Sequence, residues 1–160
     1  MTDPKAKSPA MLQFPRLAAR NLEGHALILP EAFAGSMNLV LLAFQREQQS
    51  IVDPWISWFD TISATHPGLR CYEIPMIGRR WSPARRFIDG SMAQAVREPE
   101  ARRRTVTVYT DVRRVMDTLA IDSANTVTVL LVDADGRLRY RATGAPSEQL
   151  TRELLETLTE

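Results

Sequence analysis

The stretch NLVLLAFQREQQSIVDPWISWFDTI, residues 38–62, constrains the fold more than any other part of the chain. Its residues 39–44 form an unbroken apolar run, which is typical of a strand buried on both faces and therefore of a parallel sheet. A polar bend follows at residues 45–50, and Asp53 and Pro54 suit the cap and the first turn of a helix. In open α/β sheets, ligands bind where a central strand passes to its helix. The functional site is therefore expected at this bend, which contains no cysteine, histidine or glycine.

The helix after the bend carries a wide apolar stripe. At 100° per residue its apolar side chains fall on an arc of about 160°. They are Ile51, Val52, Trp55, Ile56, Trp58, Phe59 and Ile62. So wide a stripe predicts that the helix is covered on more than one side, with Trp58 at the edge of the stripe as its most exposed member.

Strands and helices alternate through the rest of the chain. Strands are predicted at residues 17–21, 26–29, 69–75, 105–109, 127–132 and 137–142. Helices are predicted at residues 82–95, after Asp111 and after the turn at residues 144–146. Residues 76–81 are predicted to be a loop, and an arginine-rich link is predicted before Thr105. Because residues 39–44 and 127–132 are continuous apolar runs, we expect them to be adjacent central strands.

This order of elements predicts a central mixed sheet with helices on both faces and a β-hairpin before the first core strand. A length of 160 residues corresponds to one domain. We place that domain at residues 14–160 and expect residues 1–13 to be disordered or loosely attached.

Charge is spread unevenly along the chain. The net charge is +1, but residues 70–114 carry 11 basic and 5 acidic side chains, whereas residues 115–160 carry 4 and 8. All the basic residues of the middle segment are arginines. Such asymmetry indicates either solvated loops and helix ends or a charged contact surface for a partner. No nucleic-acid partner is predicted, because the total charge is near zero and no recognition motif is present.

Cysteine and histidine usage limits the chemistry. The single cysteine, Cys71, excludes an intrachain disulfide and a Cys-x-x-Cys site, and a reducing compartment such as the cytoplasm is expected. His25 and His66 pair with no nucleophile and show no metal-ligand spacing, so no metal or cofactor is predicted. The first residues lack the apolar core of a secretory signal, and no apolar stretch approaches about 18 residues, so no membrane span is expected.

Four segments resemble the thioredoxin-like superfamily, in particular its peroxiredoxin and bacterial thiol-disulfide oxidoreductase branches. They are FPRLAARNLEGHALIL, NLVLLAF, YTDVRRVMDTLAI and TVTVLLVDADGRLRYRATG, and the resemblance covers roughly residues 14–158. It implies an α/β fold of thioredoxin type, a three-layer α/β/α sandwich with a central mixed sheet and an N-terminal β-hairpin extension.

The chemistry of that superfamily lies on a cysteine at the start of the first core helix, where the helix N-terminus lowers the thiol pKa. Counting from Phe44 places the motif at residues 48–51, and counting back from Pro54 places it at residues 46–49; neither window contains a cysteine. The cis-proline that faces the motif in the family corresponds most closely to Val127, and a valine does not readily hold a cis bond. Both departures argue against dithiol chemistry.

A narrower resemblance concerns the cysteine-free bend, the run RRRTVTVYTD and the closing hairpin. These are similar to bacterial relatives of the mitochondrial ATP synthase assembly factor. The resemblance implies an assembly or chaperone-like role rather than a reductase.

We therefore predict a non-redox binding module of the cytoplasm with a protein partner. The residues predicted to contact the partner are Gln45, Arg46, Gln48, Gln49, Arg79, Arg80, Trp81, Thr126 and Val127. The alternative is a one-cysteine peroxidase or thiol transferase that uses Cys71. Against this alternative, a lone cysteine within a strand usually behaves as a small buried apolar residue.

Overall fold

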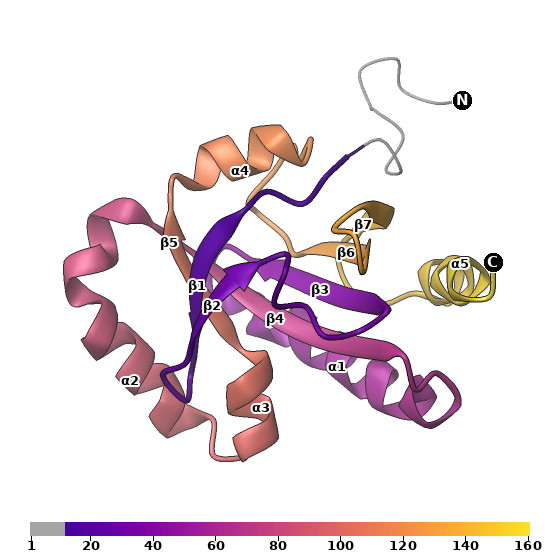
Figure 1. Ribbon diagram of the computed structural model, residues 1–160, viewed down its shortest axis with the longest axis horizontal. Helices are drawn as coiled ribbons and strands as arrows, with labels where there is room; N and C mark the ends of the chain where they lie inside the picture. Colours follow the sequence, from indigo (N-terminus) through magenta and orange to yellow (C-terminus); the bar gives the residue numbers. More distant parts are fainter. Residues whose placement is uncertain (1–11) are drawn as a thin grey trace.

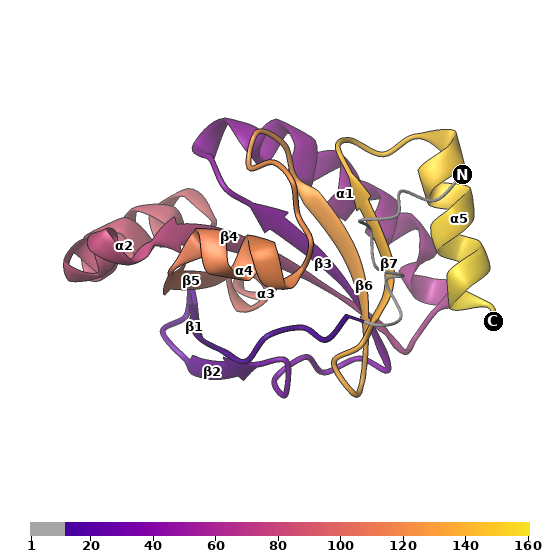
Figure 2. The same cartoon turned by 90° about the horizontal axis from the view of Figure 1, so that it is seen from above.

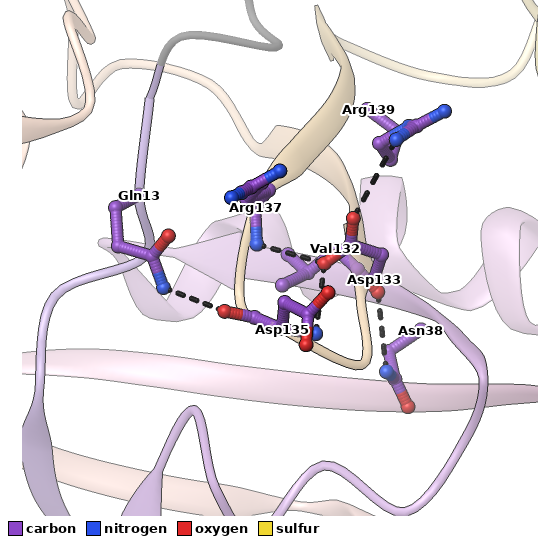
Figure 3. A network of polar contacts seen from close by, with 7 residues as sticks. All are labelled: Gln13, Asn38, Val132, Asp133, Asp135, Arg137 and Arg139. Atoms are coloured by element: carbon purple, nitrogen blue, oxygen red, sulfur yellow. Dashed lines mark hydrogen bonds and ion pairs between the residues drawn. The ribbon is translucent and has the colours of Figure 1, made fainter.

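The computed structural model describes residues 12–160 of the chain. Most of the segment expected to be loosely attached, residues 1–13, therefore lies outside the described part. Its last two residues contact the domain. Leu12 is buried and accepts a hydrogen bond from the Leu138 amide, and the Gln13 side chain donates to the Asp135 carbonyl at 2.8 Å (Figure 3). Attachment thus begins before the expected boundary at residue 14.

Seven strands form one mixed sheet with the order β2-β1-β5-β4-β3-β6-β7 (Figure 1). Their bounds are β1 Leu17–Asn21, β2 Ala26–Leu29, β3 Met37–Ala43, β4 Leu69–Gly78, β5 Val106–Thr110, β6 Thr128–Asp133 and β7 Leu138–Thr143. The predicted N-terminal hairpin is confirmed as β1 and β2. Strand β3 pairs in parallel with β4 and antiparallel with β6, so the prediction that these two apolar runs are adjacent central strands is also confirmed.

Helices cover both faces of the sheet (Figure 2). Their bounds are α1 Gln49–Ile62, α2 Arg85–Ala95, α3 Pro99–Arg104, α4 Val112–Thr118 and α5 Glu148–Leu158, with the 3₁₀ helices η2 Arg46–Gln48, η3 Ser63–Thr65 and η4 Arg79–Ala84. One core lies between the sheet and helices α1 and α5, around Trp55 and Leu154. The other lies between the sheet, α4 and the N-terminal segment, around Phe14 and Leu119. This is the predicted three-layer α/β/α arrangement.

Helix α1 begins earlier than Asp53 and Pro54 suggest. Its first residue is Gln49, so Pro54 lies inside the helix, where it cannot donate a hydrogen bond to the Ser50 carbonyl. The expected position of these two residues at the helix cap is therefore wrong. The physical reason is that Gln48 is buried against a distant loop, which starts the helix one turn upstream.

Two predictions for the segment between β4 and β5 are also wrong. Residues 76–78 are not loop but part of β4, because Met76, Ile77 and Gly78 pair with Val108, Tyr109 and Thr110 of β5. The arginine-rich link before Thr105 contains the helix α3. In addition, the helix predicted over residues 82–95 starts three residues later, at Arg85, because Ser82 lies in η4.

A tight turn joins β6 to β7 and holds a polar network (Figure 3). The Asp133 carboxylate accepts hydrogen bonds from the backbone amides of Asp135 and Arg137 and lies 3.6 Å from the Arg139 guanidinium. Gly136 takes φ +84°, a conformation that favours glycine. Because Asp133 pairs with Met37 at the start of β3, this network lies at the end of the sheet opposite to the bend and stabilises the hairpin.

Candidate functional site

The bend after β3 is closed by glutamine side chains. Gln48 is buried; its Oε1 accepts a hydrogen bond from the Phe44 amide at 2.8 Å, and its Nε2 donates to the Ala124 carbonyl at 2.7 Å. Gln45, which is exposed, donates to the same carbonyl at 3.1 Å. These contacts join the bend to the loop before β6.

This network occupies the place at which the thioredoxin-like resemblance puts a thiol. Both windows for the motif include Gln49, the first residue of α1, so the helix N-terminus is where the family pattern requires it. A glutamine amide has both a donor and an acceptor, and Gln48 uses both on backbone groups. Gln48 thus holds the bend in place through satisfied hydrogen bonds, and residues 45–50 contain no thiol and no imidazole.

Val127 and Thr126 face the bend from the β6 side in the family pattern. Val127 is buried within the core beneath α1, and the peptide bond before it is trans. Its carbonyl accepts a hydrogen bond from the Gly144 amide at 3.0 Å. Thr126 is only partly exposed. Of this predicted pair, Val127 therefore contributes to packing and presents no side chain at the surface.

A buried carboxylate lies beside the start of α1, and sequence reasoning missed it. Glu73 of β4 is only 6% exposed; it accepts a hydrogen bond from Gln49 Nε2 at 2.7 Å and one from Thr105 Oγ1 at 3.4 Å. It forms no ion pair within residues 12–160. Burial raises the pKa of the Glu73 carboxyl above its ordinary value, and the hydrogen bond from Gln49 opposes that rise. A glutamate two residues after a buried strand cysteine was the available signal, because alternate residues of a strand share a face.

We expect Glu73→Gln to raise Tm by a few degrees at pH 7. A carboxyl whose pKa is raised in the folded state contributes stability below its unfolded-state pKa, and that contribution is lost as the pH rises through the folded-state pKa. The glutamine stays neutral and keeps both hydrogen-bonding partners. The gain should therefore shrink towards pH 4, as measured by thermal unfolding across pH.

Glu47→Gln provides the matched control, because Glu47 is exposed on η2 near the same bend. Its Tm should follow that of the wild type at every pH. A lower Tm for Glu73→Gln than for the wild type at pH 7 would show that the ionised carboxylate stabilises the fold.

Cys71 lies on the same strand, away from the start of α1. It is buried between β4 and α1, and this burial raises the pKa of its thiol to about 12, although the nearby Arg104 guanidinium opposes the rise. A reactive cysteine requires the opposite shift. The surroundings of Cys71 are therefore those of a small apolar core residue.

The exposed arginines that sequence reasoning assigned to the same surface lie further away. Ala43 at the end of β3 pairs with Pro75, and β4 continues for three more residues before Arg79. At about 3.3 Å per residue, Arg79 therefore lies about 13 Å beyond the end of β3. Within residues 12–160 no hydrogen bond or ion pair joins residues 79–81 to the bend. The structure thus brings Gln45, Gln48 and the loop before β6 together, and it leaves Arg79, Arg80 and Trp81 as a separate group.

Two further features concern residues 12–160, the arrangement of metal-ligating side chains and the character of the helices. No group of three or more His, Cys, Asp or Glu side chains there is arranged to hold a metal ion. None of the helices in that range combines the length and the apolar character needed to cross a membrane.

Comparisons with solved structures identify the fold. A thiol:disulfide interchange protein from Bacteroides sp. is 17% identical, with a TM-score of 0.63 over 93% of this chain and 90% of that chain. BsSco, a member of the Sco family of cytochrome c oxidase assembly proteins, is 12% identical, with a TM-score of 0.63 over 97% and 98%. The exposed lipoprotein thioredoxin Etrx1 from Streptococcus pneumoniae is 12% identical, with a TM-score of 0.59 over 91% and 98%. The predicted thioredoxin-like fold is confirmed, and at these identities the likeness extends to the fold alone.

Comparison of the sequence with family models gives a match over nearly the whole chain. The model described as ATP10 protein matches residues 5–160. No curated protein sequence matches the chain.

Proposed function

The chain belongs to the ATP10 protein family, and from this membership we propose that it is a non-redox binding module that assists the assembly of an ATP synthase. The family is one of assembly factors, and membership therefore supports a protein partner. One observation supports the non-redox character of the module. The buried amide of Gln48 occupies the position in the bend at which a thiol enzyme of this fold would have its cysteine.

The buried thiol supports the same proposal. A peroxidase or transferase would need Cys71 as an accessible thiolate, whereas burial raises the pKa of this thiol to about 12. At neutral pH nearly all of the thiol is therefore protonated. The alternative of a one-cysteine enzyme gains no support from the site.

The proposed contact residues are the exposed members of the predicted set. They are Gln45, Arg46, Gln49, Arg79, Arg80 and Trp81. Gln48 and Val127 are buried, and their part is to hold the bend and the loop before β6 in place. The proposal includes a chaperone-like action in the cytoplasm, where a chain with a single cysteine needs no oxidising environment.

Complementation in the native host tests the proposal. We expect deletion of the gene to lower the amount of fully assembled ATP synthase, measured on native gels, with its subunits still synthesised. Both the wild-type chain and Cys71→Ser should restore assembly, because the proposed action uses no thiol.

Two results would contradict this proposal. Unchanged ATP synthase in the deletion strain would remove the assembly role. Restoration by the wild type but not by Cys71→Ser, with both chains present at equal levels, would favour the thiol enzyme instead.

A further inference from the structure

Helix α2 attaches to the sheet through polar side chains. Asp89 accepts hydrogen bonds from the Tyr109 hydroxyl at 2.6 Å and from Thr107 Oγ1 at 3.1 Å. The Arg85 guanidinium lies 4.7 Å from the centre of the Tyr109 ring. Arg102 of α3 donates to carbonyls at the end of α2. No residue of α2 is fully buried, so its side towards the protein is held by charge and hydrogen bonds instead of by an apolar core.

The outer side of this region exposes two large aromatic residues. Phe87 is 79% exposed and Trp81 is 49% exposed, and within residues 12–160 the only other exposed large apolar residue is Ile28. With three residues per turn in η4 and 3.6 in α2, Trp81 and Phe87 recur near one side of the segment. Figures 1 and 2 show α2 at the end of the molecule opposite to α5, where its outer side is open.

The exposed charged residues next to these two aromatic residues in the sequence are arginines. Arg79, Arg80 and Arg86 are exposed, and none of them forms an ion pair within residues 12–160. The Arg80 guanidinium lies 5.3 Å from the Trp81 ring. The only acidic residue between residues 74 and 97 is Asp89, and it is turned towards Thr107 and Tyr109.

We propose that Arg79, Arg80, Trp81, Arg86 and Phe87, here named the η4–α2 surface, bind an acidic amphipathic segment of a partner protein. The inference rests on the proposed function and specifies the chemistry of its partner. Exposed aromatic and arginine side chains are the residue types that dominate protein interfaces. Guanidinium groups that form no ion pair within residues 12–160 match carboxylates of a partner with charge-assisted hydrogen bonds.

A protein segment fits this surface better than a lipid bilayer. Helices that lie in a membrane interface bury a broad apolar face into the acyl region. Here Ile88 and Met92 are partly buried within the protein, and the exposed large apolar residues of η4 and α2 are Trp81 and Phe87 alone. Two aromatic rings next to arginines match a partner segment that has a narrow apolar stripe bordered by acidic side chains.

The test uses the full chain and a defined probe. The probe is a fluorescently labelled 16-residue helical peptide with a stripe of leucine and phenylalanine bordered by glutamates, and its twin carries lysine for every glutamate. We expect saturable binding of the glutamate peptide only, measured by fluorescence anisotropy. Trp81→Ala/Phe87→Ala and Arg79→Glu/Arg80→Glu should each weaken binding at least tenfold, and higher salt should weaken the wild-type affinity.

Arg113→Glu/Arg114→Glu is the matched control. It reverses an equally exposed arginine pair on α4 and changes the net charge by the same amount, so its affinity should stay within twofold of the wild type. Because the substituted arginines and Phe87 are exposed and Trp81 is about half exposed, every variant should keep a Tm close to that of the wild type.

Three outcomes would overturn the inference. They are equal binding of the lysine twin, equal loss of binding in the α4 control, and binding to vesicles containing phosphatidylglycerol without binding to the glutamate peptide. The last would assign the η4–α2 surface to a lipid. The assembly role is tested separately, by restoration of ATP synthase in the deletion strain. A failure of the peptide-binding proposal is therefore distinguishable from a failure of the proposed function.

Discussion

Replacing Trp55 by alanine is expected to lower the free energy of unfolding by about 3–5 kcal/mol. Trp55 is fully buried in the core between the sheet and helices α1 and α5. Its indole Nε1–H donates a hydrogen bond to the Gly144 carbonyl at 2.8 Å, which links α1 to the segment that leads into α5. The substitution therefore opens a large cavity and leaves that carbonyl without its partner. Urea denaturation followed by circular dichroism measures the loss.

Two further variants separate these contributions. Trp55→Phe keeps most of the apolar volume but removes the donor, and we expect a loss of about 1–3 kcal/mol. Trp58→Ala is the matched control, because Trp58 packs edge-on against Trp55 at 5.7 Å between ring centres but is only partly buried. Its loss should be clearly smaller than that of Trp55→Ala. Equal losses at the two positions would show that the wide stripe of α1 is buried evenly.

The second large effect is expected at Gln48. Gln48→Ala should lower the free energy of unfolding by about 2–3 kcal/mol, because it removes both hydrogen bonds of a buried amide and leaves the Phe44 amide without its acceptor. The variant should nevertheless show no disulfide reductase activity. Denaturation in urea and an insulin-reduction assay measure the two properties.

Gln45→Ala is the control for this position. Gln45 donates to the same Ala124 carbonyl, but its side chain is exposed and water replaces the lost bond, so the change should be within about 0.5 kcal/mol. If the two glutamine variants lowered the free energy of unfolding equally, the burial of Gln48 would not explain its contribution to the stability of the bend.

The sequence alone determined most of the framework. Unbroken apolar runs identified β3 and β6 as neighbouring central strands, because only strands covered on both faces have no need for alternate polar residues. The short separation of the strands predicted at residues 127–132 and 137–142 identified the β6–β7 hairpin, and Gly136 in its turn takes a positive φ. Asp111 was recognised as the start of α4, and it accepts a hydrogen bond from the Arg114 amide as a helix cap does. Each of these features is visible in a short stretch of sequence, as an apolar run, a turn or a helix cap.

Contacts between distant segments decided the candidate site. The absence of cysteine from the bend was visible in the sequence, but the burial of Gln48 depends on Ala124, which lies 76 residues later in the chain. Likewise, Glu73 is buried because Gln49 and Thr105 enclose it from other elements. Spacing along the strand places Glu73 on the same face as Cys71, but it does not identify the polar partners, because these come together only when the chain folds.

Tertiary structure also decided which side of α2 faces the sheet. The sequence predicted a helix over residues 82–95, and in the structure Phe87 is largely exposed, whereas Asp89 and Arg85 hold the helix to β5. Periodicity shows that a helix has an apolar side, but it does not say which surface that side meets. In this chain the neighbouring strand presents Thr107 and Tyr109, whose hydroxyl groups pair with Asp89. The polar side of α2 therefore turns inward, and Phe87 remains exposed at the surface.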